Sequence, residues 1–343
     1  MKQGIEQPSD WTIAGLHPVA DWVYRIPLAL PLQDLSVVNC YLFISDNNVV
    51  LVDPGFSTPD TERLLADALR KLNLHPSDVD RIIATHTHWD HYSQAISLRE
   101  KYGIPISIGK EERHTVVAES LQEGLYPLQI KRLYSCGAAP LARRVLALPR
   151  EDHEIGVPYG APDSYLSEGE RIPLGRRDLI IHETPGHTRG HIVISDPLSG
   201  VQVTGDHILP RITPSLGLEL RPERFPLTSF MSSLNACLRL PDAMMLPAHG
   251  AVSDSVHERA KALLQHHQER LDEIAAKVDA GASTALEVAS NLTWTRRGRD
   301  LSELNPIHQM LAVLEVAAHL DMLSVEGLVQ ETIFDDVMHY VLA

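Results

Sequence analysis

The fold of this chain is decided by residues 81–91, which read Arg81-Ile82-Ile83-Ala84-Thr85-His86-Thr87-His88-Trp89-Asp90-His91. The apolar start, residues 82–84, predicts a short buried strand. If the backbone stays extended beyond it, His86 and His88 project to the same side, because side chains alternate along a strand. A helix is expected next, with Asp90 and His91 in its first turn and Gly103 as its stop. The strand end and the helix start would bring three imidazoles and a carboxylate into one small volume.

Three further segments each end an apolar run with a residue that can bind a metal. These residues are His187, Asp206 and His249, after apolar runs at 179–181, 201–204 and 244–246. Surface histidines in polar loops are the alternative, and they would explain a lone His better than His-x-His-x-Asp-His directly after a buried strand. In open α/β sheets, ligands bind beyond the carboxyl ends of the strands. The combined pattern therefore predicts a metal site at one edge of a sheet.

This ordered set resembles the metallo-β-lactamase superfamily, whose members carry His-x-His-x-Asp-His and then His, Asp and His. The resemblance covers about the first three quarters of the chain, and it implies an α/β fold, the αββα sandwich. It also implies two divalent metal ions held by seven residues: His86, His88 and His187 at one ion, Asp90, His91 and His249 at the other, and Asp206 between them. Zinc is the expected metal, with iron or manganese as alternatives, because imidazole and carboxylate ligands suit all three.

The resemblance further implies that the two ions bracket a water and lower its pKa from 15.7 to roughly 7, so that a metal-bridging hydroxide is the nucleophile. No Ser or Cys nucleophile is then required. We predict that Asp90 and Asp206 are catalytic as well as metal-binding, and we expect no organic cofactor.

Asp206 also narrows the predicted reaction. The true β-lactamases of the superfamily lack a bridging carboxylate at this step, whereas glyoxalase II-like thioesterases, lactonases, other esterases and phosphodiesterases retain it. The sequence therefore favours a hydrolase of a small ester, thioester or lactone. A metal-dependent phosphodiesterase or ribonuclease is the alternative. A non-catalytic protein on this fold would be marked by lost ligands, and here none is lost.

Supporting residues are predicted with less specific signals. Asp53 follows the apolar run at 49–52, and such a carboxylate commonly hydrogen-bonds a ligand imidazole and fixes its tautomer; the alternative is a turn-forming Asp before Pro-Gly. His191 and His207 lie close to predicted ligands in sequence, but we expect them to be packed or solvated rather than metal-binding.

Composition limits the partners and the compartment. The chain has 343 residues, a formal net charge of −15, 44% hydrophobic residues and three cysteines that lie far apart. The acidic balance argues against a nucleic acid as the main partner, because phosphates require clustered cations. The cysteine usage favours a reducing cytoplasmic setting. Neither a signal peptide nor a membrane-spanning segment is expected.

Two domains are predicted. Residues 1–253 form the catalytic domain, in which an insertion at 110–162 is either a lid over the substrate entrance or a solvated helical excursion. Residues 254–343 form a smaller domain of three helices and a hairpin, expected at 323–329, that resembles the winged-helix appendage of some superfamily members. Because its helices are not basic, we favour a structural role or homodimer formation over nucleic-acid binding. Chemistry is not expected to need side chains after Asp254.

Overall fold

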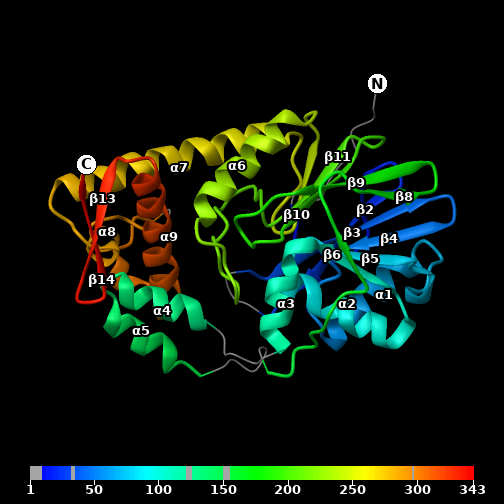
Figure 1. The fold of residues 1–343 in the computed structure, drawn as a ribbon. Coiled ribbons are helices and arrows are strands. Elements are labelled where there is room, and N and C mark those ends of the chain that lie inside the picture. The colour runs from blue at the N-terminus through cyan, green and yellow to red at the C-terminus, as the bar shows by residue number, and fades with distance from the viewer. Residues whose placement is uncertain (1–9, 32–34, 121–125, 150–154, 296) are drawn as a thin grey trace.

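The computed structural model describes residues 10–31, 35–120, 126–149, 155–295 and 297–343. Within these ranges two mixed sheets stack face to face (Figure 1). The first sheet contains, in spatial order, β1 (His17–Ala20), β2 (Val23–Ala29), β3 (Val37–Ser45), β4 (Asn48–Val52), β5 (Arg81–Ala84), β6 (Ile106–Gly109) and β7 (Ser164–Leu166). The second contains β12 (Met244–Pro247), β11 (Val201–Gly205), β10 (Ile192–Asp196), β9 (Arg177–Glu183) and β8 (Arg171–Leu174).

Helices cover the outer faces of both sheets. The helices are α1 (Pro59–Arg70), α2 (Trp89–Tyr102), α3 (Arg113–Ser120), α4 (Pro127–Ser135), α5 (Ala139–Leu146), α6 (Pro226–Arg239), α7 (Val256–Asp279), α8 (Ala285–Ser290) and α9 (Pro306–Val325). Helices α1 and α2 pack on the first sheet, and α6 and α7 pack on the second (Figure 1). The predicted αββα sandwich is therefore confirmed.

Strand β5 shows how the sequence pattern produces these layers. Ile82 and Ile83 are both fully buried but belong to different apolar clusters, because successive side chains point to opposite faces. Ile82 packs toward the helices α1 and α2, whereas Ile83 packs between the two sheets. A strand buried on both faces must be apolar throughout, which is what residues 82–84 are.

Capping residues mark several helix boundaries, and the predicted helix stop at Gly103 is confirmed. Thr58 caps α1, since its hydroxyl accepts a hydrogen bond from the Thr61 N–H at 3.1 Å. Gly103 ends α2 in the left-handed conformation, with φ 74°. Thr284 and Glu287 form the capping box of α8, and Asn305 caps α9.

The hairpin predicted at 323–329 is wrong. Helix α9 continues to Val325, and the hairpin lies later, as β13 (Val329–Phe334) and β14 (Val337–Leu342). The turn between its strands consists of Asp335 and Asp336, both with positive φ. The apolar stretch around Leu323 fits a helix as well as a strand, and packing of Leu320 and Leu323 into the helical core decides for the helix.

The insertion and the C-terminal segment share one apolar core. Leu133 of α4 and Leu141 of α5 belong to the same buried cluster as Ile274 of α7, Val288 of α8 and Val313 of α9. These helices and the hairpin gather at one end of the molecule, and α7 runs from there to the sandwich (Figure 1). We call this end the helical half. The expected insertion also includes residues 121–125 and 150–154, which lie outside the described residues. Among the described helices, none is long and apolar enough to cross a membrane.

Candidate metal centre

The seven predicted ligands come together at one end of the sandwich. The turn between β5 and α2 supplies His86 and His88, and the first turn of α2 supplies Asp90 and His91. The loops after β9, β11 and β12 supply His187, Asp206 and His249. Their ligand atoms form two groups, one of His86, His88, His187 and Asp206 and one of Asp90, His91 and His249. Within each group all these atoms lie within 4.8 Å of one another. Four separate segments of the chain therefore contribute residues to these two groups.

The first group is centred on His187. Its Nε2 lies 3.3 Å from Nε2 of His86 and 3.2 Å from Nδ1 of His88. The carboxylate of Asp206 reaches the same point, with Oδ2 3.5 Å from Nε2 of His187. We call these residues the histidine group.

The second group, which we call the carboxylate group, is centred on the Oδ2 atom of Asp90. This atom lies 3.5 Å from Nε2 of His91 and 3.4 Å from Nε2 of His249. The other oxygen of Asp206, Oδ1, lies 3.7 Å from Nε2 of His91 and 3.4 Å from Nε2 of His249. Each oxygen of Asp206 therefore faces a different group, as the predicted bridging role requires.

Hydrogen bonds at the outer ring nitrogens show which nitrogen of each candidate ligand histidine carries the proton. Nδ1 of His187 donates to the Ser215 carbonyl at 2.7 Å, and Nε2 of His88 donates to the Leu218 carbonyl at 2.7 Å. Nδ1 of His249 donates to the Val37 carbonyl at 2.9 Å. A carbonyl only accepts, so each of these outer nitrogens must carry the proton.

When these rings are neutral, their inner nitrogens carry lone pairs that face one another or the carboxylates. Nε2 of His91, Nε2 of His249 and Oδ1 of Asp206 are buried and have no hydrogen-bond partner among the described residues. Buried acceptors that face each other are costly unless something satisfies them. A cation coordinated by these atoms would do so, and therefore the residues fit a metal ion at each group.

The electrostatics of the two groups differ. Burial and the neighbouring His88 lower the pKa of His187 to about 4, and burial holds the pKa of His86 well below its ordinary value. Burial also opposes protonation of His91, but the carboxylates of Asp90, Asp206 and Asp53 outweigh it and raise its pKa to about 10. His86 and His187 thus offer neutral imidazoles, whereas the carboxylate group attracts positive charge, which a proton or a metal cation can supply.

Asp53 lies where the sequence placed it, beside a ligand imidazole. Its Oδ2 accepts from Nδ1 of His91 at 3.0 Å and from the Thr85 hydroxyl at 2.8 Å, and its Oδ1 accepts from the Thr85 N–H at 2.7 Å. The residue has a φ of 51° and is fully buried. Asp53 therefore ties the end of β4 to the end of β5 and orients His91.

Sequence reasoning missed Glu112, which is fully buried behind the histidine group. Its carboxylate accepts from the Thr188 hydroxyl at 2.5 Å and from the Thr87 hydroxyl. Thr87 separates His86 from His88, and Thr188 follows His187, so one carboxylate holds both segments that carry the histidine group. The only signal in the sequence was a hydroxyl residue next to each ligand, which did not indicate the partner.

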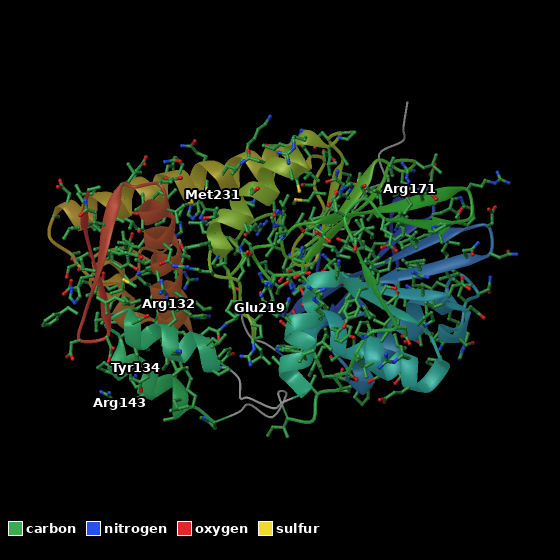
Figure 2. All side chains as sticks on the ribbon, in the orientation of Figure 1. Arg132, Tyr134, Arg143, Arg171, Glu219 and Met231 are labelled. Carbon is green, nitrogen blue, oxygen red and sulfur yellow. The ribbon has the colours of Figure 1, made fainter. Side chains whose placement is uncertain are left out.

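The segment 215–219 was also missed as part of the site. Besides accepting from His187 and His88, it is held in place by Glu219, whose carboxylate accepts from the Arg189 N–H at 2.6 Å and from the Thr115 hydroxyl at 2.8 Å. Gln129 of α4 donates from Nε2 to the carbonyls of Gly217 and Glu219 at 2.9 and 2.7 Å. Glu219 lies between the helical half and the sheets (Figure 2). This segment therefore connects the candidate ligands His88 and His187 to the inserted helix α4.

His191 is buried and supports Asp206 from behind. Its Nε2 accepts from the Asp206 N–H at 3.2 Å, and its Nδ1 shares a hydrogen bond of 2.8 Å with the Thr184 hydroxyl. Gly205 allows this approach, because a Cβ there would lie 2.5 Å from Nε2 of His191. His207 is buried against Phe230, with ring centroids 4.9 Å apart. His191 and His207 are both fully buried, and neither belongs to the two candidate groups.

Comparisons with known proteins agree with this geometry. The family model described as "Metallo-beta-lactamase superfamily" matches residues 34–249. A relative from Bacillus subtilis, named "Probable metallo-hydrolase YqjP", is 24% identical over 306 residues, which are 88% of this chain and 91% of the relative. The hydroxyacylglutathione hydrolase GloC of Haemophilus influenzae is 30% identical over 170 residues, 49% of this chain and 65% of that protein.

Solved structures extend the likeness over the helical half. A metallo-β-lactamase family protein from Thermus thermophilus has a TM-score of 0.75 and 26% identity, with 94% of this chain and 99% of that chain covered. A β-lactamase domain protein from Burkholderia ambifaria shares the fold with a TM-score of 0.76 and 23% identity, over 98% of each chain. The family match spans more than half of the residues and includes all seven predicted ligands, and the chain therefore belongs to the metallo-β-lactamase superfamily of metal-dependent hydrolases.

Proposed function

We propose that this protein is a dinuclear metal hydrolase that cleaves a carboxylic ester, thioester or lactone. The observation that carries the proposal is Asp206, whose two oxygens face the two ligand groups at 3.4 to 3.7 Å. We assign His86, His88 and His187 to one ion and Asp90, His91 and His249 to the other, with zinc as the preferred metal. Two bound ions of this kind would supply Lewis acidity and an acidified water.

The protein's own residues would keep this arrangement rigid and in the correct protonation state. The carbonyls of Ser215, Leu218 and Val37 hold the protons of three ligand rings on the outer nitrogens. Asp53 does the same for His91. Such outer partners raise the basicity of the ligands and fix their orientation.

A cysteine nucleophile is not needed and is not supported. Cys40, Cys136 and Cys237 are all buried. Burial raises the pKa of the Cys136 and Cys237 thiols to about 12, and it raises that of Cys40 well above its ordinary value. Thiols that stay protonated are poor nucleophiles.

The names of two relatives and the net charge support this substrate class. GloC and a relative from Cereibacter sphaeroides, which is 28% identical over 187 residues, are named hydroxyacylglutathione hydrolases. A substrate of that kind is a small thioester. The net charge of −15 disfavours the phosphodiesterase or ribonuclease alternative, because a nucleic acid would be repelled.

The test is a substrate panel with the zinc- or manganese-loaded protein. Thioesters, p-nitrophenyl esters and lactones should be hydrolysed, and the activity should disappear after metal removal by a chelator and return with added metal. The metal content of the loaded protein should be two ions per chain. Turnover of RNA or bis-p-nitrophenyl phosphate without any ester turnover would replace the proposal by the alternative.

A further inference from the structure

A buried arginine lies on the face of the first sheet that points toward the second sheet. Arg25 of β2 is 1% exposed and lies directly opposite Tyr41 of β3, whose ring belongs to the apolar cluster between the sheets. Its guanidinium donates from one nitrogen to the Trp11 carbonyl at 2.6 Å and to Oδ1 of Asn39 at 3.0 Å. Among the described residues, no carboxylate forms an ion pair with Arg25. Because a buried charge without a carboxylate partner is costly, the contact with Asn39 points to a role other than ion pairing.

The contact with Arg25 fixes the orientation of the Asn39 amide. A guanidinium can only donate, so Oδ1 of Asn39 faces it and Nδ2 points the other way. Nδ2 donates to the carbonyls of Pro247 and Gly250 at 2.9 and 2.8 Å. The backbone N–H of Asn39 donates to the Ala248 carbonyl at 2.7 Å. One fully buried asparagine therefore binds three carbonyls at the end of β12 and in the loop that follows it.

The loop held in this way carries the candidate ligand His249. Strand β12 is the edge strand of the second sheet, with only β11 beside it among the described strands. Strand β3 of the first sheet supplies the missing support, since the Tyr41 hydroxyl donates to the Pro247 carbonyl at 2.8 Å and the Val37 carbonyl accepts from Nδ1 of His249 at 2.9 Å. Nε2 of the same ring faces Oδ2 of Asp90 at 3.4 Å. The position of this ligand is thus set by residues of the opposite sheet.

We propose that Arg25 and Asn39 are positioning residues for His249. Arg25 fixes the orientation of the Asn39 amide, and the amide holds the loop that presents Nε2 of His249 to the carboxylate group. The inference rests on the proposed function, since it assigns the support of one of its two ions. Loss of such an outer partner weakens metal binding by about 10- to 100-fold. The loss should fall on the ion of the carboxylate group and spare the ion of the histidine group.

Asn39→Asp is the first test, because it keeps the size of the side chain and the acceptor for Arg25. Beside the guanidinium the new carboxylate stays ionised, so it cannot donate to the carbonyls of Pro247 and Gly250. In a competitive chelator titration with zinc, we expect one ion to bind at least about tenfold more weakly and the other to stay within about twofold. Unchanged affinity for both ions, or equal weakening of both, would overturn the proposal.

Gln202→Ala is the matched control. Gln202 is a buried amide on β11, and its Nε2 donates to the Pro241 carbonyl at 3.3 Å, ahead of β12 rather than after it. This variant should keep both zinc affinities within about twofold of the wild type, because it leaves the loop of His249 untouched. A loss as large as that of Asn39→Asp would show that removal of any buried amide in the sandwich loosens the metal, and it would overturn the proposal.

Arg25→Met tests whether the arginine acts through the asparagine. In the wild-type background this substitution should weaken the same ion by about tenfold. In the Asn39→Ala background it should cause no further loss beyond about twofold, because two residues that act as one unit are not additive. Losses that multiply in the double variant would show that Arg25 does not act through Asn39, and would overturn its part in the proposal.

Hydrogen exchange of the metal-free protein measures the position of the loop without any ion. Peptides that cover residues 244–253 should exchange faster in Asn39→Asp than in the wild type, and at the wild-type rate in Gln202→Ala. If the wild type holds fewer than two ions, the proposed function is wrong, while the exchange rates still decide whether Asn39 holds the loop. If the wild type holds two ions and hydrolyses esters, but Asn39→Asp matches it in exchange and in zinc affinity, the hydrolase stands and the positioning role is wrong.

Discussion

Buried histidines occur in both halves of this molecule, and their hydrogen bonding differs. In the sandwich, the outer nitrogens of His86, His88, His187 and His249 have oxygen partners. The inner nitrogens of the first three face one another, and that of His249 faces Asp90 and Asp206. In the helical half, Nδ1 of His319 donates to the Glu315 carbonyl at 2.7 Å, and its Nε2 accepts from Nδ1 of His267 at 3.1 Å. The second set is a donor-to-acceptor chain, whereas the first is a converging cluster of acceptors.

The difference shows which property marks a metal site. Burial lowers the pKa of His267 to about 3 and that of His319 to about 4, much as it does for His187. A depressed pKa therefore does not separate the two sets. Convergence of lone pairs beside carboxylates does, and within the described residues the potential metal-binding groups lie only in the sandwich.

The largest effect is expected from substitution of Asp206, and its absence would contradict the distinction between the two sets of histidines. Asp206→Ala removes the only ligand that faces both groups, so we expect fewer than two ions per chain and a fall in ester turnover of more than about 100-fold, beyond the typical loss for an outer partner. Elemental analysis and kinetics on the same preparation measure both. His267→Phe in the helical half is the control and should keep two ions. Two tightly bound ions in Asp206→Ala would contradict the bridging role.

A smaller effect is expected at Asp53. Asn tolerates the positive φ of this position, so Asp53→Asn should fold, but it removes the charge that orients His91. Metal affinity should fall by about 10- to 100-fold, and mainly at one of the two ions, because Asp53 contacts the carboxylate group. A competitive chelator titration resolves the two ions. Equal weakening of both would show that the groups are not independent.

A substitution at Glu112 tests whether its hydrogen bonds hold the histidine group in place. Glu112→Gln weakens its hydrogen bonds to the Thr87 and Thr188 hydroxyls, and we expect about a tenfold loss in kcat/KM with the fold retained. The matched control is Glu111→Gln, a neighbouring carboxylate that pairs with Arg113 at the surface. If both variants have the same kcat/KM, the hydrogen bonds of Glu112 to Thr87 and Thr188 do not contribute to the site.

The smallest effect concerns acid stability of the helical half. The pKa of His267 is lower in the folded state than its unfolded value of about 6.5, so the unfolded state binds more protons below that pH. Stability is thus complete above about pH 6.5 and is lost as the pH falls toward the folded value of about 3, by up to about 1.4 kcal/mol per pH unit. The groups around this ring are His266, Arg270, Glu315 and His319.

Denaturant unfolding at pH 7, 6 and 5 measures this loss. His267→Phe keeps the ring shape and removes one titrating group, so its stability should fall less steeply with acid than that of the wild type. Metal content should not change in the variant. An identical pH dependence in the two proteins would show that His267 is not the group that titrates.

Local signals predicted the elements of the sandwich well, because they depend on short-range chemistry. Gly103 ends α2 as predicted, since the positive φ of a helix C-cap is satisfied within a few residues. The hairpin prediction failed at Leu323, where periodicity was ambiguous and long-range packing decided. Glu112 and the segment 215–219 were not predicted, because their roles depend on partners about 25 to 130 residues away in sequence.

The sequence by itself identified the candidate ligands, and its resemblance to a known superfamily predicted the sandwich. Ligand-type residues directly after apolar strands are expected beyond the carboxyl ends of those strands, as in open α/β sheets. The tertiary structure places β5 in one sheet and β9, β11 and β12 in the other, and the stacking of the two sheets brings their ligand-type residues together. Only the tertiary structure decided that each oxygen of Asp206 faces a different group and that Glu112 holds two ligand segments together. The tertiary structure also decided that α4 packs into the core formed by α7, α8 and α9. These features depend on how distant surfaces fit, and side-chain packing across such distances leaves no periodic pattern in the chain.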